Sequence, residues 1–183
     1  MHIQKDNWKE ITMLQTDRLH LRNLRPGDAQ TLYAYRNDSR CNRYQRYEDT
    51  GMDYLQSFVA RYAGSRFPSR EEEQHYAICL GEEDTMIGDL SVFFTERDNC
   101  FTLGITIAPA FQGQGYGYAL LRGVIAKLRQ HFPAVDLVAL IEKENTGSIA
   151  LFQKLGFVEE CYAESVGSYV YVIYGSGGAE SSL

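Results

Sequence analysis

The sequence predicts one mixed α/β domain, with helices packed on a sheet that contains both antiparallel hairpins and a parallel crossover. The chain of 183 residues has the length of a single domain. Apolar residues make up 44% of it and aromatic residues 13%, which is enough for a full core. The expected elements run β-α-α-β-β-β-α-β-α-β-β, so hairpins come first and a β-α-β-α-β unit follows.

The first part of the chain is expected to form a strand and two helices. Residues 16–24 alternate apolar and polar side chains, which is typical of a half-buried strand. A helix is expected over 26–36, with Asp28 in its first turn. A second helix is expected over 52–63, where apolar residues recur at helical spacing and Gly64 follows as the cap.

Two hairpins follow these helices. Their strands are expected over 74–80, 85–95 and 100–108, and each run is rich in apolar and β-branched residues. Polar turns at 81–84 and 96–99 separate the three strands. The middle of the chain therefore predicts an antiparallel meander.

The last part of the chain predicts the β-α-β-α-β unit. After a glycine-rich loop, an apolar helix ends near His131. The nearly continuous apolar run 135–141 is typical of a strand that is buried on both faces. A helix over 147–155 precedes two closing strands at 157–162 and 169–174, and the second of these is either sheet interior or the edge of a homodimer.

Composition predicts the boundaries of the folded domain and the cellular location of the protein. Residues 1–11 form a polar N-terminal extension, 12–175 the folded domain, and 176–183 a flexible Gly/Ser tail. No apolar run is long enough for a membrane helix, and the N-terminus lacks the apolar stretch of a secretory signal. These features, with cysteines that are expected to be reduced core thiols, predict a cytoplasmic protein with no membrane partner.

Charge and the metal-ligating residues narrow the function classes. The net charge is −6, divided into +4 for residues 1–70 and −10 for residues 71–183, which disfavours nucleic-acid binding and suits a cationic substrate. The cysteines and histidines are scattered without zinc-ligand spacing, so no metal site is expected. These residues are Cys41, Cys79, Cys100, Cys161, His2, His20, His75 and His131.

The most informative stretch is the glycine loop between the third meander strand and the apolar helix. Glycines at positions 113, 115 and 117 permit positive φ and close approach to a ligand, and the helix N-terminus adds free N–H groups, so the loop suits a pyrophosphate. Its G-x-G-x-G spacing differs from the dinucleotide fingerprint, and no Lys-Ser or Lys-Thr pair completes a Walker loop. The alternative is a connector that only lets the helix pack closely on the sheet.

Three motifs resemble the GNAT N-acetyltransferases. Gln112-Gly113-Gln114-Gly115-Tyr116-Gly117 is similar to that family's Q/R-x-x-G-x-G/A acetyl-CoA loop. The segment from Asn145 to Phe157 resembles its second motif, N-x-x-[AS]-x-x-[LV]-[YF]-x-K-x-G-F. The opening T-D-R-L-x-L-R of residues 16–22 resembles the ribosomal-protein acetyltransferase (RimJ/RimL-like) branch. The resemblance spans about residues 12–174.

The resemblance implies a fold and a cosubstrate. The fold would be a mostly antiparallel sheet, splayed between its two parallel central strands, with helices on both faces. The cosubstrate would be acetyl-CoA, with no metal. Its pyrophosphate would lie on the loop, its pantetheine arm along the preceding strand, and further contacts would come from the second motif. The implied cofactor-binding residues are Ile105, Ile107, Gln112, Gly113, Gln114, Gly115, Tyr116, Gly117, Asn145 and Phe152.

The resemblance also implies direct attack of an amine on the thioester in a ternary complex. Many members place a Tyr acid where this chain has Phe152, so Ser148, one helical turn earlier, is the candidate acid. A serine that only bonds back to a carbonyl is the alternative. Asp89, which interrupts an apolar strand, is the candidate base, and a water chain is the alternative.

The expected activity is acetyl transfer to a primary amine. The acceptor is a protein N-terminus (a ribosomal protein by the branch resemblance), a polyamine or an aminoglycoside-like molecule. An enzyme alternative on the same fold uses a different acyl donor or a hydroxyl acceptor. Outside the enzymes, a noncatalytic acyl-CoA sensor is the first alternative. The second is an RNA-associated module that uses the arginines between Arg36 and Arg46. The simpler interpretation of that segment is an exposed connector between two helices, whose tyrosines lie near the acceptor.

Overall fold

A computed structural model of the chain describes residues 13–45 and 47–176. The predicted N-terminal extension (1–11) and all but one residue of the predicted tail lie outside these ranges. The backbone N–H of Ser176, the last described residue, donates to the carbonyl of Pro133 at 2.7 Å.

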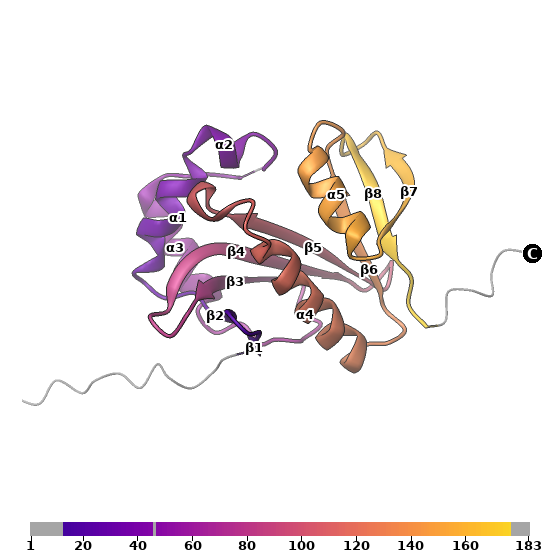
Figure 1. Cartoon of the computed structure of the whole chain (residues 1–183), viewed down its shortest axis with the longest axis horizontal. Helices are drawn as coiled ribbons and strands as arrows, with labels where there is room; N and C mark the ends of the chain where they lie inside the picture. Colours follow the sequence, from indigo (N-terminus) through magenta and orange to yellow (C-terminus); the bar gives the residue numbers. More distant parts are fainter. Residues whose placement is uncertain (1–12, 46, 177–183) are drawn as a thin grey trace, which may run out of the picture.

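Eight strands form one sheet, in the order β1-β2-β3-β4-β5-β6-β8-β7. Figure 1 shows α1, α2 and α3 on one side of the molecule, and α5, β7 and β8 on the other. The strands are β1 (Leu14–Gln15), β2 (Leu19–Asn23), β3 (Glu73–Leu80), β4 (Thr85–Thr95), β5 (Cys100–Ile107), β6 (Asp136–Ile141), β7 (Val158–Ala163) and β8 (Ser168–Ile173). The helices are α1 (Asp28–Arg36), α2 (Ser39–Asn42), α3 (Met52–Tyr62), η2 (Pro109–Phe111), α4 (Tyr116–His131) and α5 (Thr146–Lys154).

The pair β5·β6 is the one parallel pair in this sheet, and it is short. Its register runs from Cys100↔Asp136 to Thr102↔Val138 and then stops, although both strands continue. The backbone of residues 103–107 therefore has no strand partner on the side that faces β6. The mostly antiparallel sheet, splayed between two parallel central strands, is confirmed.

Helices cover both faces of the sheet, because side chains alternate along each strand. On one face, α4 and Phe152 of α5 pack on alternate residues of β3, β4 and β5, such as Tyr76, Leu90 and Leu103. On the other face, α1 and α3 pack on residues that include Ala77. This second face carries the polar residues of the site described below.

Three short elements were not predicted, namely β1, α2 and η2, the 3-10 turn that follows β5. β1 is a two-residue strand that pairs with β2 across a tight turn, so the predicted strand at 16–24 is wrong over its first three residues. α2 is a single turn whose N-terminus is capped by the Asp38 side chain, which accepts from the Arg40 N–H. Ala63, rather than Gly64, caps α3, because the backbone there stays in the right-handed region and does not need glycine.

The remaining element predictions are confirmed to within one or two residues. No helix in the described ranges has the length and apolarity to cross a membrane. The four cysteines are unpaired, and Cys41 and Cys79 are buried.

Candidate functional site

The separation of β5 from β6 leaves an inter-strand cleft of about 310 Å³. It brings together four residues that the sequence singled out: Ile105, Asn145, Ser148 and Phe152. Other parts of its wall were not predicted, and they come from β5, β6, the β7–β8 turn and the segment after α2. These residues are Tyr44, Gln45, Phe93, Leu103, Gly104, Ala139, Leu140, Ile141, Glu142, Val166 and Ser168.

The glycine loop lies between β5 and α4. Gly113 and Gly115 adopt φ of +74° and +80°, in the left-handed region that favours glycine. Gly115 is the N-cap of α4, so the first N–H groups of this 16-residue helix have no intrahelical acceptor. The Gln112 Nε2 donates to the carbonyl of Ile107 at 2.8 Å and ties the loop to β5. The loop can therefore hold an anion on backbone N–H groups.

Two loop side chains face away from the inter-strand cleft. Tyr116 is buried, and its hydroxyl accepts a hydrogen bond from Arg18 of the β1–β2 turn. Gln114, Gly115 and Tyr116 line a separate pocket with Arg18 and Arg122. Any contact of Tyr116 with a ligand on the loop is therefore through its backbone.

The first turn of α5 forms one wall of the inter-strand cleft. Asn145 is its N-cap, and the side-chain oxygen accepts from the Ser148 N–H at 3.2 Å. Ser148 is half-buried, and no hydrogen bond of its hydroxyl to another described residue is present. Phe152 packs edge-on against Phe157 at 5.0 Å, so the position of the usual Tyr acid holds a core ring.

A second, polar cavity of about 340 Å³ opens on the α1/α3 face of the sheet, directly beside the inter-strand cleft. Both are lined by Gln45, Phe93 and Gly104. The floor is built by strand register, with His75↔Ser91↔Gly104 in one row and Asp89↔Thr106 in the next. The walls come from α1, α3 and the segment between α2 and α3. The other lining residues are Arg36, Tyr47, Glu48, Tyr54, Phe58 and Glu73.

Asp89 occupies this polar cavity, but both of its oxygens are engaged. One accepts a hydrogen bond from Tyr35, and the other lies 3.1 Å from Arg36 Nη2. Burial together with the Asp89 charge raises the pKa of Tyr35 well above its usual value. Burial opposes the charge of Arg36, but Asp89 outweighs it and raises the Arg36 pKa. Asp89 is therefore a buried anchor for the end of α1.

His75 and Glu73 form a pair at the other end of the polar cavity. The His75 Nε2 lies 3.1 Å from a Glu73 oxygen, and the ring contacts Phe58, Tyr62 and Phe93. Burial lowers the pKa of His75 below 6.5, so the ring is neutral at pH 7. Among the described residues, Nδ1 of His75 and Nε of Arg36 are buried without a hydrogen-bond partner.

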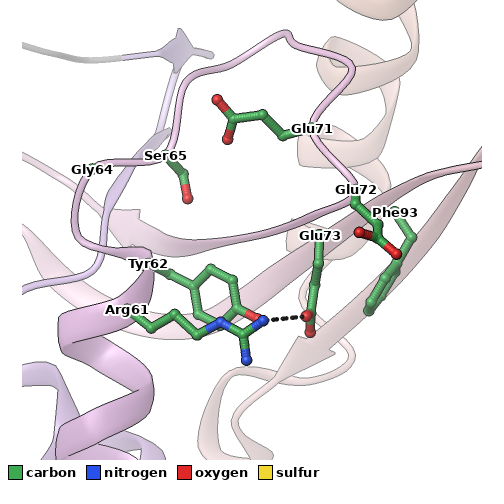
Figure 2. Close-up of a pocket in the computed structure, with 8 residues that line it drawn as sticks. All are labelled: Arg61, Tyr62, Gly64, Ser65, Glu71, Glu72, Glu73 and Phe93. Carbon is green, nitrogen blue, oxygen red and sulfur yellow. Dashed lines mark hydrogen bonds and ion pairs between the residues drawn. The ribbon is translucent and has the colours of Figure 1, made fainter.

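A third opening, the glutamate pocket, continues from the polar cavity. Figure 2 shows Glu71, Glu72 and Glu73 around it, with Arg61, Tyr62 and Ser65 on the opposite side. Glu73 and Phe93 line both this pocket and the polar cavity. Phe93 also borders the inter-strand cleft, so one side chain touches all three spaces.

One group of side chains has the composition of a metal site. His20, Cys79 and Asp84 place a ligand atom each within 4.8 Å of one another. Asp84 is already paired with Arg22 at 2.9 Å and with Arg25, so a cation there would meet two guanidinium groups. We interpret this cluster as an ion-pair network that holds the β3–β4 turn against β2.

The arginines between Arg36 and Arg46 lie in different environments. Arg36 is 3% exposed and stacks between Tyr47 and Phe58, at 4.6 and 4.5 Å. Arg40 pairs with Asp38 on the surface, and Arg46 lies outside the described residues. Arg36 is thus unavailable to a nucleic acid, and Tyr44 and Tyr47 line the inter-strand cleft and the polar cavity, respectively.

A family model described as Acetyltransferase (GNAT) domain matches residues 18–158. No curated protein matches the chain significantly. Solved structures do match, at identities of about one in five or less, which shows the fold alone.

Three of these structures illustrate the likeness. A GNAT-family acetyltransferase from Bacillus anthracis is 17% identical, with a TM-score of 0.73 over 88% of this chain and 97% of its own. A proposed ribosomal-protein-serine acetyltransferase from Vibrio cholerae is 20% identical, with a TM-score of 0.73 over 88% and 96%. A spermidine N-acetyltransferase from Vibrio cholerae, solved with CoA and spermine, is 20% identical, with a TM-score of 0.69 over 88% and 98%.

Proposed function

Because this chain belongs to the GNAT acetyltransferase family, we propose that it moves the acetyl group of acetyl-CoA to a cationic primary amine. One observation carries the choice of acceptor. The inter-strand cleft opens past Gly104 into a polar cavity that Glu48, Glu73 and Asp89 line against the single cation Arg36 among its described residues. A protonated amine in this cavity would lie beside the cleft.

Acetyl-CoA would be held mainly by backbone groups. The loop from Gln112 to Gly117 would bind the pyrophosphate through N–H groups at the α4 N-terminus. The unpaired edge of β5 at Ile105 and Ile107 would pair with the pantetheine arm as an added strand does. Asn145 and Phe152 would contact the same arm from α5.

The reaction would proceed without an acyl-enzyme. The neutral amine nitrogen attacks the thioester carbon, and one backbone N–H of β5 stabilises the oxyanion by about 3 kcal/mol. The C–S bond then breaks, and Ser148 gives its hydroxyl proton to the leaving thiolate while it receives one from the new amide nitrogen. The proton lost from the ammonium before attack passes to water beside Asp89 and from there to solvent.

The acceptor classes remain a protein N-terminal amine, a polyamine or an aminoglycoside-like amine. The similarity to a spermidine acetyltransferase and to a proposed ribosomal-protein acetyltransferase supports the first two. We place the protein in the cytoplasm, where acetyl-CoA and these amines occur together.

Phe152 favours a second candidate function. A ring without a hydroxyl stands where an acid is usual, and a sensor that binds acyl-CoA without turnover would need no acid. Such a protein would keep the cofactor loop and lose the reaction.

Calorimetry with acetyl-CoA, followed by thiol release with a panel of amines and N-terminal peptides, tests both functions. We expect micromolar binding and turnover on a cationic amine class. Binding without turnover on any of them would support the sensor instead, and no binding would contradict the assignment of the glycine loop.

A further inference from the structure

The three spaces of the site form a continuous path across the sheet. The inter-strand cleft meets the polar cavity at Gly104, and the polar cavity meets the glutamate pocket at Glu73. Phe93 borders all three. An acceptor whose amine reaches the cleft can therefore extend to the glutamate pocket without leaving the protein surface.

The far end of this path is strongly acidic. Within the described residues, the carboxylates of Glu71 and Glu72 have no ion-pair partner. Glu73 pairs with Arg61 at 3.5 Å, but the Arg61 side chain is 70% exposed, so this pair contributes little. In Figure 2 the Glu71 carboxylate extends over the opening toward Ser65. The pocket carries more negative charge than its own arginine balances.

His75 supplies an unused acceptor beside Glu73, in the polar cavity where it adjoins the glutamate pocket. The ionised Glu73 carboxylate only accepts hydrogen bonds, so Nε2 of His75 must be the donor between them. Nδ1 is then a lone-pair acceptor, and it is buried without a partner in a residue that is 8% exposed. The rings of Phe58, Tyr62 and Phe93 surround this imidazole, and aromatic faces attract ammonium groups.

The register of the sheet sets the distance between the two ends of the path. His75 pairs with Ser91, and Ser91 with Gly104, so two strand spacings, or about 10 Å, separate His75 from the border of the inter-strand cleft. We propose that Glu71, Glu72, Glu73 and His75 bind a second ammonium group of the acceptor, which is therefore an extended dication. This inference rests on the proposed function and names its substrate class.

A series of α,ω-diamines tests the distance directly. Thiol release is measured with saturating acetyl-CoA for diamines from propanediamine to decanediamine, each against the monoamine of the same carbon chain. We expect the ratio of diamine to monoamine kcat/KM to peak at about tenfold for hexanediamine to octanediamine, whose extended chains match the spacing of about 10 Å. The short diamines are expected to behave as monoamines.

Three variants locate the second subsite. Glu72→Gln and Glu73→Gln each remove one charge, and His75→Phe keeps the aromatic packing while it removes Nδ1. Each is expected to lower the peak ratio toward one through a higher KM for the long diamine. Glu82→Gln, on the exposed β3–β4 turn, is the matched control and is expected to keep the ratio. Glu71→Gln replaces His75→Phe if that variant does not fold.

The outcomes separate this inference from the proposed function. Turnover with no diamine preference, or with a peak at the shortest diamines, would overturn the dication and leave the acetyltransferase. A neutral N-terminal peptide that is acetylated faster than every diamine would do the same. If acetyl-CoA binds and no amine is acetylated, the proposed function fails, and the second subsite fails with it.

Discussion

The inter-strand cleft and the polar cavity lie side by side, but backbone groups form the first and side chains form the second. The cleft and the neighbouring glycine loop depend on backbone, namely an unpaired edge of β5 in the cleft, and a left-handed Gly115 and a free helix N-terminus in the loop. The polar cavity depends on side chains from α1, α3 and three strands, held by the buried pair Arg36–Asp89. The comparison teaches that cofactor and acceptor recognition can be perturbed separately in this protein.

The largest expected effect is on the polar cavity, with Asp89→Asn. This change leaves Arg36 buried without its counter-charge, which we expect to cost about 3–5 kcal/mol of unfolding free energy. Urea denaturation measures it. The double variant Arg36→Leu/Asp89→Leu removes both charges and is expected to recover most of the stability without activity. A single Asp89→Asn variant as stable as the wild type would refute the anchoring role.

Gly115→Glu perturbs the other region. The substitution places a carboxylate at a left-handed position beside the expected pyrophosphate, so acetyl-CoA affinity should fall on the order of 1,000-fold, or about 4 kcal/mol. Calorimetry gives the affinity. Gly115→Ala, which adds strain without charge, should lose about tenfold, or roughly 1–2 kcal/mol. Gly27→Glu at the exposed N-cap of α1 is the control for an added charge. Unchanged affinity in Gly115→Glu would separate the loop from cofactor binding.

Ser148→Ala tests whether binding and catalysis can be separated within the cleft. Ser148 lines the cleft, but its proposed role is to protonate the leaving thiolate and not to bind acetyl-CoA. Loss of the acid is expected to lower kcat about 100-fold and to leave the acetyl-CoA affinity nearly unchanged. Steady-state kinetics and calorimetry on one preparation supply the two values. Thr146→Ala, on the exposed first turn of the same helix, serves as control. If kcat were retained, water rather than Ser148 would protonate the thiolate.

The smallest expected effect is the pH dependence of the polar cavity. Burial holds the pKa of His75 below 6.5, and Arg36 acts in the same direction, while Asp89 and Glu73 act in the opposite one. The neutral ring accepts from an ammonium, so the KM of a long diamine should be flat above pH 6.5. Once the pH falls below this lowered pKa, Nδ1 becomes protonated, and KM should rise by at most about tenfold per pH unit.

The pH profile has its own control. His75→Phe removes the imidazole from the polar cavity, so its KM for the long diamine is expected to stay flat from pH 5 to 8. If NMR shows that the His75 ring becomes protonated within this range and the wild-type KM stays flat through that pH, His75 does not contact the ammonium.

The sequence predicted the glycine loop and the start of α5 because the residues of each lie close together along the chain. The loop from Gln112 to Gly117 and the turn at Asn145 follow local patterns, and local patterns determine backbone conformation. The strands of the meander were also predicted well, because apolar residues alternate within single segments. β1 was missed because two residues give no period, whereas the Asp38–Ser39 pair before α2 was a capping signal that could have been used.

The polar cavity could not be predicted in the same way. Asp89 stood out as a charge in an apolar strand, but its partners Tyr35 and Arg36 lie 54 and 53 residues away. In the sequence, His75 is one polar residue within a predicted strand. The rings that surround it come from α3 and β4, which are separate segments of the chain. The alternation of Asp89, Ser91 and Phe93 was the available clue to a shared face, and only the register of β3, β4 and β5 turned it into a cavity.

The seam between β5 and β6 has a consequence for cooperativity. Only the pairs from Cys100↔Asp136 to Thr102↔Val138 join β6, β8 and β7 to the rest of the sheet. A molecule that pairs with β5 and contacts α5 would connect the two parts of the sheet across this seam and oppose their local separation. The amides of β6 and β8 should then exchange with solvent in a common phase, and this phase should slow when that molecule is bound.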